Sequence, residues 1–289
     1  MEEIKTISIK DENYPKLLRE IKEAPEVLYY KGEILPEENC FAVVGTRMAS
    51  AYGKQVALEI AGDLAEAGLT IVSGLAPGID TFCHQAAVER KKRTIAILGT
   101  GLDEKSIYPQ SNLKLVKKIL ENNGCLISEY PPGTHGTKFT FLQRNRIISG
   151  LSSGVLVIEA KQKSGALNTA AWAKKQGRKL FAIPGPIYSS NSKGPHYLIK
   201  NGARLAENAN DILKELNLPL PTPGVDNLIG ENLEENLILE ALKEGALDAD
   251  KIIEKTKLSA AKVASTLAIL EIKGIVRNLG GNIYAISHR

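Results

Sequence analysis

The sequence predicts an α/β protein with an extended Rossmann-like, doubly wound sheet that is mostly parallel, followed by a C-terminal winged-helix domain. Three observations support this prediction. Short apolar runs alternate with helical periodicity over residues 40–216, which is typical of repeated βα units with right-handed crossovers. A proline-rich linker is expected at 217–231,. Residues 232–289 then offer three helical segments and a hairpin with a Gly-Gly turn,.

Residues 1–39 form the first segment, with 6 basic and 10 acidic residues and a net charge of −4. Leu17, Leu18 and Ile21 are spaced as on one face of a short amphipathic helix,. A short strand is expected at 27–30,. We expect this segment to be a cap packed on the main domain rather than an independent fold.

Strands and helices alternate in the main domain. The expected strands are 41–44, 70–72, 94–98, 126–127, 155–158, 180–183 and 204–205. The expected helices are 52–67, 79–89, 112–122, one on each side of strand 155–158, 197–200 and 210–216. Ligands of such sheets bind outside the carboxyl ends of the strands. We therefore expect one edge to be lined by the loops that begin at Gly45, Ser73, Gly99 and Ser164.

Basic residues are concentrated around strand 155–158. The stretch 131–200 holds 11 basic residues and one acidic residue, Glu159, a net of +10, whereas the whole chain carries +4 from 37 basic and 33 acidic residues. A local basic patch indicates polyanion binding better than a high pI does. The alternative is an ordinary solvated surface, which we expect for Lys174, Lys175, Arg178 and Lys179,.

Part of this basic stretch surrounds the start of a predicted helix at Ser164-Gly165. Such a start presents unpaired backbone N–H groups and the positive end of a dipole. The stretch therefore suits a phosphate-bearing ligand. The cations that flank the strand are Lys138, Arg144, Arg146, Lys161 and Lys163.

The sequence lacks the residue patterns of several other kinds of binding site. Gly45 and Gly53-Lys54 are too far apart for a P-loop, and the G-x-G-x-x-G dinucleotide pattern is absent after the first strand,. The histidines show no metal-ligand spacing, and three scattered cysteines fit buried thiols of a cytosolic protein,. We expect no cofactor and no metal, and a cytoplasmic protein without a membrane segment, since no apolar run reaches about 18 residues,.

Two acidic residues remain as candidates for catalysis. Asp80 and His84 are four residues apart and share a helix face,. They could act as an acid–base pair, but we favour a structural hydrogen bond that holds the helix start. Glu159, at the end of a strand, is the other candidate acid. These residues leave open an alternative function, a Rossmann-like nucleotide-binding or nucleotide-processing enzyme.

The C-terminal domain is charge-neutral, with 8 basic and 8 acidic residues over 232–289. Its third helix offers only Lys262 and Lys273, with Glu271 between them. A winged helix can bind DNA through this helix, or it can be a protein-contact module, which the neutral charge slightly favours. A winged-helix transcription factor, which would prefer duplex DNA, is a third possible function.

Specific motifs are distributed over about the whole chain. They are Tyr14-Pro15 with Ala24–Gly32, Val44–Arg47, Ser73–Ala76 with Gly78–Asp80 and His84, Gly99–Asp103 with Tyr108-Pro109, Ser128-Glu129 with Pro131–Gly133, Arg144–Ser152, Ser164–Leu167 with Thr169-Ala170, and Pro184-Gly185. In these motifs the chain resembles the DNA-processing protein A family (DprA, also called Smf), bacterial proteins of natural transformation and recombination. Pro77 is a departure, because the family often has Arg there.

The resemblance implies a non-enzymatic recombination mediator. Such a protein binds single-stranded DNA, protects incoming DNA and loads a RecA-type recombinase in natural transformation. Arg47 is similar to the family's phosphate-gripping Arg, and Lys138 and Phe141 to its lysine and aromatic pocket residues. No catalytic residue is expected. The full set of expected DNA-binding residues is Arg47, Lys138, Phe141, Arg144, Arg146, Lys161, Lys163, Ser164, Gly165 and Asn168.

The resemblance also implies a homodimer through the Rossmann-like domain. The segment 184–216 ends the predicted sheet with short elements, which leave an edge and an apolar helix face to be covered,. We expect Leu198, Ile199 and Ile212 to lie in the dimer interface.

Overall fold

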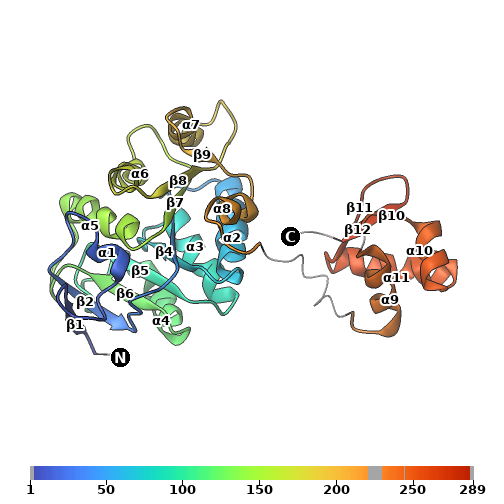
Figure 1. The fold of residues 1–289 in the computed structure, drawn as a ribbon, viewed down its shortest axis with the longest axis horizontal. Coiled ribbons are helices and arrows are strands. Elements are labelled where there is room, and N and C mark those ends of the chain that lie inside the picture. The colour runs from blue at the N-terminus through green and yellow to red at the C-terminus, as the bar shows by residue number, and fades with distance from the viewer. Residues whose placement is uncertain (1–2, 221–229, 244, 287–289) are drawn as a thin grey trace. The chain divides into compact units, whose positions relative to one another are not determined.

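The computed structural model describes residues 3–220, 230–243 and 245–286, and the chain divides into two compact units, Met1–Leu220 and Pro221–Arg289 (Figure 1). Each unit has its own hydrophobic core. The division falls within the linker expected at 217–231, of which residues 221–229 lie outside the described residues.

The described part of the first unit forms one nine-stranded sheet in the order β1-β2-β6-β5-β4-β3-β7-β8-β9. The β1–β2 and β2–β6 pairs are antiparallel, and the other neighbouring strands pair parallel. The doubly wound, mostly parallel sheet predicted from the sequence is confirmed. The strands are β1 (Lys5–Ser8), β2 (Val27–Gly32), β3 (Cys40–Gly45), β4 (Thr70–Ser73), β5 (Thr94–Leu98), β6 (Cys125–Ser128), β7 (Gly154–Ile158), β8 (Lys179–Ala182) and β9 (Arg204–Leu205).

Helices cover both faces of this sheet (Figure 1). In β3, Ala42 and Val44 face one helical layer, and Phe41 and Val43 face the other. This two-sided burial explains the continuous apolar runs of the central strands. The first layer is α1 (Lys16–Arg19), α5 (Lys138–Gly150), α6 (Gly165–Lys175) and α7 (Lys193–Lys200), and the second is α2 (Ala51–Glu66), α3 (Ile79–Glu89), α4 (Leu113–Glu121) and α8 (Ala209–Glu215).

The strand order reverses in the middle of the sheet. From β3 the chain builds outward through β4 and β5 to β6, and it then returns to place β7 on the other side of β3. Such a reversal opens a crevice at the carboxyl ends of the two central strands. Gly45 ends β3 there, and a Cβ at this position would lie 1.9 Å from the Ile158 carbonyl oxygen of β7. Only glycine allows the two strands to end so close together.

The N-terminal segment is more integrated than a packed cap. Its strands β1 and β2 extend the sheet beyond β6, while Leu18 and Ile21 around α1 pack against Gly150 of α5. Strand β1 was not predicted, because its Lys-Thr-Ile-Ser sequence is too short and polar to show a pattern. Pairing with β2 fixes the position of β1, and the sequence of β1 alone does not predict this pairing.

The structure corrects two of the three dimer residues expected from the sequence. Ile212 is completely buried and Leu198 is only 8% exposed, so both belong to the monomer core. Ile199 is half-buried and packs against the same core as Leu198. Leu198 and Ile212 therefore have almost no surface left for a contact between two chains, whereas Ile199 keeps a partly exposed side chain. The outermost strand, β9, instead exposes Leu205, which is 47% accessible.

The second unit is the predicted winged helix, with one additional strand. The short strand β10 joins the predicted hairpin in a sheet of order β10-β12-β11. The sequence predicts the first helix of this unit over 235–244, and residue 244 lies outside the described residues. The elements are α9 (Leu233–Leu242), β10 (Leu247–Asp248), α10 (Ala249–Thr256), α11 (Ala260–Ile272), β11 (Val276–Asn278) and β12 (Ile283–Ile286).

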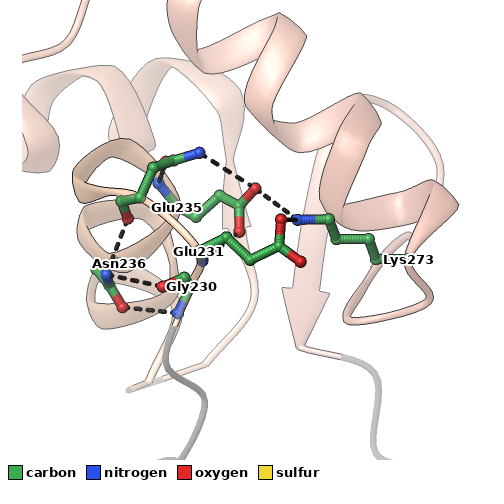
Figure 2. A network of polar contacts seen from close by, with 6 residues as sticks. Gly230, Glu231, Glu235, Asn236 and Lys273 are labelled. Carbon is green, nitrogen blue, oxygen red and sulfur yellow. Dashed lines mark hydrogen bonds and ion pairs between the residues drawn. The ribbon is translucent and has the colours of Figure 1, made fainter.

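A polar network fixes the start of this unit (Figure 2). The Lys273 ammonium lies 2.8 Å from Glu235 Oε1 and 2.9 Å from Glu231 Oε2. Asn236 accepts a hydrogen bond of 2.7 Å from the Gly230 backbone N–H. The hydrogen bond from Lys273 holds the pKa of the buried Glu235 carboxyl below its ordinary value. One of the two lysines expected to be available on the third helix is therefore engaged with glutamates.

Candidate nucleic-acid interface

A pocket of about 520 Å³ opens at the carboxyl edge of the sheet, where β3 and β7 end side by side. Its walls come from the loop after β3, the first turns of α5, and the loop that leads from β7 into α6. Eight of the ten expected DNA-binding residues line it, whereas Arg146 and Asn168 do not. The eight are Arg47, Lys138, Phe141, Arg144, Lys161, Lys163, Ser164 and Gly165.

Exposed cations surround this pocket. Arg47, Lys138, Lys161 and Lys163 are all solvent-exposed, and none of them forms an ion pair with another described residue. The acidic residue in the lining is Asp80, which is buried. The pocket therefore has a positive potential at its rim, which attracts anions.

The start of α6 forms one wall of the pocket. Ser164 precedes this helix, yet its hydroxyl makes no capping hydrogen bond and has no partner among the described residues. Nothing lies within 4 Å of the place where a Cβ would project from Gly165. The first N–H groups of α6 and the Ser164 hydroxyl are therefore donors suited to a phosphate oxygen.

Asn145 holds the start of α6 against α5. Its side-chain amide donates to the Gly165 carbonyl oxygen and to Asn168 Oδ1, both at 3.2 Å. Asn168 is thus part of the support behind the pocket wall rather than of the lining. Sequence reasoning did not single out Asn145, although it follows Phe141 by four residues and Lys138 by seven, the spacing of one helix face.

The aromatic residue of the pocket lies against one of its cations. Thr137 and Thr140 form a reciprocal capping box that begins α5 and places Lys138 in its first turn. One turn later, Phe141 is half-buried, and the Arg47 guanidinium lies 5.5 Å from its ring centroid. Cation and ring are thus neighbours, an arrangement suited to a ligand with both phosphates and bases.

Arg144 reaches the pocket but is committed to the protein backbone. It is only 4% exposed, and its Nη1 donates to the carbonyl oxygens of Gly74 and Ile97 at the ends of β4 and β5. Burial lowers the pKa of this guanidinium to about 10. Its first role is therefore to hold the strand ends beneath the pocket.

Arg146 is not brought to the pocket. Its guanidinium pairs with Glu129, at 2.9 Å between Nη1 and Oε2, and its Nε donates to the Glu23 carbonyl oxygen at 2.9 Å. With only 4% of its surface exposed, the residue joins α5 to the N-terminal segment. A buried arginine paired in this way has a structural function.

The expected hydrogen bond between Asp80 and His84 is absent. Asp80 Oδ2 accepts from the Gly74 backbone N–H at 3.1 Å, whereas His84 Nδ1 lies 2.8 Å from Thr94 Oγ1. Burial raises the pKa of the Asp80 carboxyl and lowers that of His84 to about 3, so the imidazole is neutral at physiological pH. Asp80 and His84 lie on the same helix face, but each makes a structural contact of its own and they do not form a pair.

Glu159 is also committed to structure. Its carboxylate accepts hydrogen bonds from the Ser50 backbone N–H at 2.9 Å and from Ser50 Oγ at 2.6 Å, at the start of α2. Its backbone adopts a φ of 50°, which is uncommon outside glycine,. Glu159 does not line the pocket.

Neither a metal centre nor a membrane helix is found in the described ranges. No group of three or more His, Cys, Asp or Glu side chains is placed there to hold a metal ion. None of the helices over those same ranges has the length and apolar character needed to cross a membrane.

A doubly wound sheet with a basic, aromatic-containing pocket at its switch point defines an α/β protein built to bind a polyanion. The chain belongs to the DNA recombination-mediator protein A family, whose family model matches residues 5–217. A second family model, the DprA winged helix domain, matches residues 225–282. The resemblance seen in the sequence motifs is confirmed.

Individual relatives agree with this assignment. The DNA processing protein DprA of Bacillus subtilis is 43% identical over 215 residues, which cover 74% of this chain and 71% of that protein. The X-ray structure of DprA from Streptococcus pneumoniae matches with a TM-score of 0.69 at 44% identity, covering 74% of each chain. DprA of Helicobacter pylori, whose structure describes a single-stranded DNA binding mode, matches with a TM-score of 0.66 at 32% identity, over 75% of this chain and 98% of that one.

We predict that Arg144→Met lowers the free energy of unfolding of the first unit by about 2–4 kcal/mol, because two buried carbonyl groups lose a charged donor. Urea denaturation followed by the fluorescence of Trp172, the single tryptophan, reports on this unit alone. Exposed Arg47→Met is the control and should change stability by less than about 0.5 kcal/mol. An unchanged midpoint for Arg144→Met would contradict its structural role.

Proposed function

We propose that this protein is a single-stranded DNA-binding recombination mediator that protects incoming DNA and loads a RecA-type recombinase in natural transformation. The observation that carries the proposal is the switch-point pocket, where four exposed cations surround a half-buried aromatic ring and an uncapped helix start. Its family membership and its likeness to the Helicobacter pylori protein support the same function.

The pocket offers both kinds of contact that a single strand needs. Phosphates bind to cations and to helix N-termini, and bases stack on aromatic rings whatever their sequence. Arg47, Lys138, Lys161 and Lys163 supply the first kind of contact, and Phe141 supplies the second. A duplex hides its base faces, so this combination favours single strands.

We predict that Arg47→Ala and Lys138→Ala each weaken binding to single-stranded DNA by about 1–3 kcal/mol, because each loses a charge-assisted phosphate contact. Each should also reduce the slope of log affinity against log salt, since fewer counterions are released. Fluorescence anisotropy with a labelled oligonucleotide measures both quantities.

Lys92→Ala is the matched control for this pair. Lys92 is an exposed lysine just before β5 begins at Thr94, and it is therefore at the opposite, amino edge of the sheet. Its loss should leave affinity and salt slope nearly unchanged. If all three variants bound alike, the switch-point pocket would not be the DNA site.

The proposed homodimer has a more suitable surface than the one expected from the sequence. Strand β9 is the last strand of the sheet, and Leu205 is exposed on it. A two-fold contact would cover this edge with a single self-complementary patch. We expect sedimentation to detect a dimer at micromolar concentration and Leu205→Glu to dissociate it. A wild-type species of 31.3 kDa, the mass of one chain, would contradict the dimer.

We further propose that the protein is not an enzyme, because its two candidate acids both serve the fold. Asp80 holds the Gly74 loop, and Glu159 holds the start of α2. Incubation with nucleoside triphosphates should therefore give no turnover. Hydrolysis by the wild type that disappears in Glu159→Gln would favour the nucleotide-processing alternative instead.

A further inference from the structure

We propose that Tyr108 is a second base-stacking residue of the interface, which carries the bound strand beyond Phe141 toward the carboxyl end of β5. The inference rests on the proposed single-stranded DNA function and extends its site. Tyr108 lies in the loop that follows β5, outside the residues that line the pocket. Its ring centroid is 5.6 Å from that of Phe141, and the two ring planes are tilted by 48°.

Protein groups cover part of the half-buried Phe141 ring. The Arg47 guanidinium lies over the ring at 5.5 Å from its centroid. Gly99 and Gly136 bring bare backbone against it, because a Cβ on either glycine would lie 2.8 Å or 2.4 Å from a ring carbon. Tyr108, by contrast, is 46% exposed. A base that reaches this part of the site therefore meets the Tyr108 ring.

Arg47, Phe141 and Tyr108 consequently form a continuous row of contacting groups. The row begins at the cation beside β3 and ends in the loop after β5. Two neighbouring aromatic rings, the second of them open to solvent, provide stacking surface for successive bases of a single strand.

The charge of the β5 loop decides which part of a nucleotide meets Tyr108. Asp103, Glu104 and Lys105 precede the tyrosine and sum to −1. Asp103 is fixed in place, because its carboxylate accepts hydrogen bonds from the Gly133 backbone N–H at 2.6 Å and from Ser106 Oγ at 2.8 Å. These carboxylates repel phosphates. The contact at Tyr108 is therefore to a base, and the phosphates remain with the cations of the pocket.

The test compares Tyr108→Ala and Tyr108→Phe with the wild-type chain of 289 residues on two labelled strands of equal length. One is oligothymidine, and the other has abasic sites throughout. Tyr108→Ala should bind oligothymidine about 5- to 150-fold more weakly, the range for one lost base–aromatic stack. On the abasic strand it should bind as the wild type does. Tyr108→Phe should match the wild type on both, and the salt slope should not change.

Two variants make the outcome decisive. Tyr197→Ala removes a tyrosine that is 56% exposed on α7, away from the pocket lining, and should have no effect on either strand. Lys138→Ala should weaken binding to both strands, because it loses a phosphate contact. An equal loss on both strands for Tyr108→Ala would mean that Tyr108 only supports Phe141, and no loss on either would mean that it does not touch the strand.

The same assay separates the two proposals. If Lys138→Ala weakens binding and Tyr108→Ala does not, the pocket is the DNA site and the stacking role of Tyr108 is wrong. If neither variant has an effect, the proposed function of the pocket is itself wrong. Trp172 fluorescence during unfolding verifies that each variant has the stability of the wild type.

Discussion

The buried guanidinium of Arg144 is the contact on which the geometry of the candidate site depends. Carbonyl groups at the ends of parallel strands have no ladder partner, and here those of Gly74 and Ile97 converge on one donor. Asp80 accepts a hydrogen bond from the Gly74 N–H, and its charge partly offsets that of the buried guanidinium. With the ends of β4 and β5 fixed in this way, the cations at the rim need no structural role and remain available for a ligand.

The sequence predicted that loops from several strands meet at one edge of the sheet, as the pocket lining shows, but it could not rank the cations there. A charge count treats Lys138, Arg144 and Arg146 alike. At about 100° per residue, Arg144 lies roughly 60° around α5 from Phe141, and Arg146 roughly 140°. Helical geometry could therefore have excluded Arg146. It could not have shown that Arg144 bonds to Gly74 and Ile97, because both acceptors are distant in sequence and unmarked by their side chains.

Contacts between residues distant in sequence also decide the roles of the expected dimer residues and of the lysines of the winged helix. An apolar residue on a short terminal element can belong to the core or to an interface, and Leu198 and Ile212 belong to the core. The sequence offers Lys262 on α11 and Lys273 directly after it, but the structure pairs Lys262 with Glu234 and Lys273 with Glu231 and Glu235. DNA binding by this helix would compete with those pairs, whereas its exposed Ile269 and Ile272 fit a protein contact,.

The switch-point geometry also constrains how a mediator can release its strand. The uncapped helix start follows β7, and the aromatic row ends after β5, three strands away across β3 and β4. At about 4.8 Å between strands this distance is roughly 14 Å, which a few nucleotides of a single strand can span. In the proposed binding mode one chain holds only a few nucleotides, a contact short enough for the proposed recombinase partner to displace. Tight retention of a long strand then requires several such sites to bind it at once. Linked sites raise the overall affinity for the strand, while each single site still releases its few nucleotides quickly.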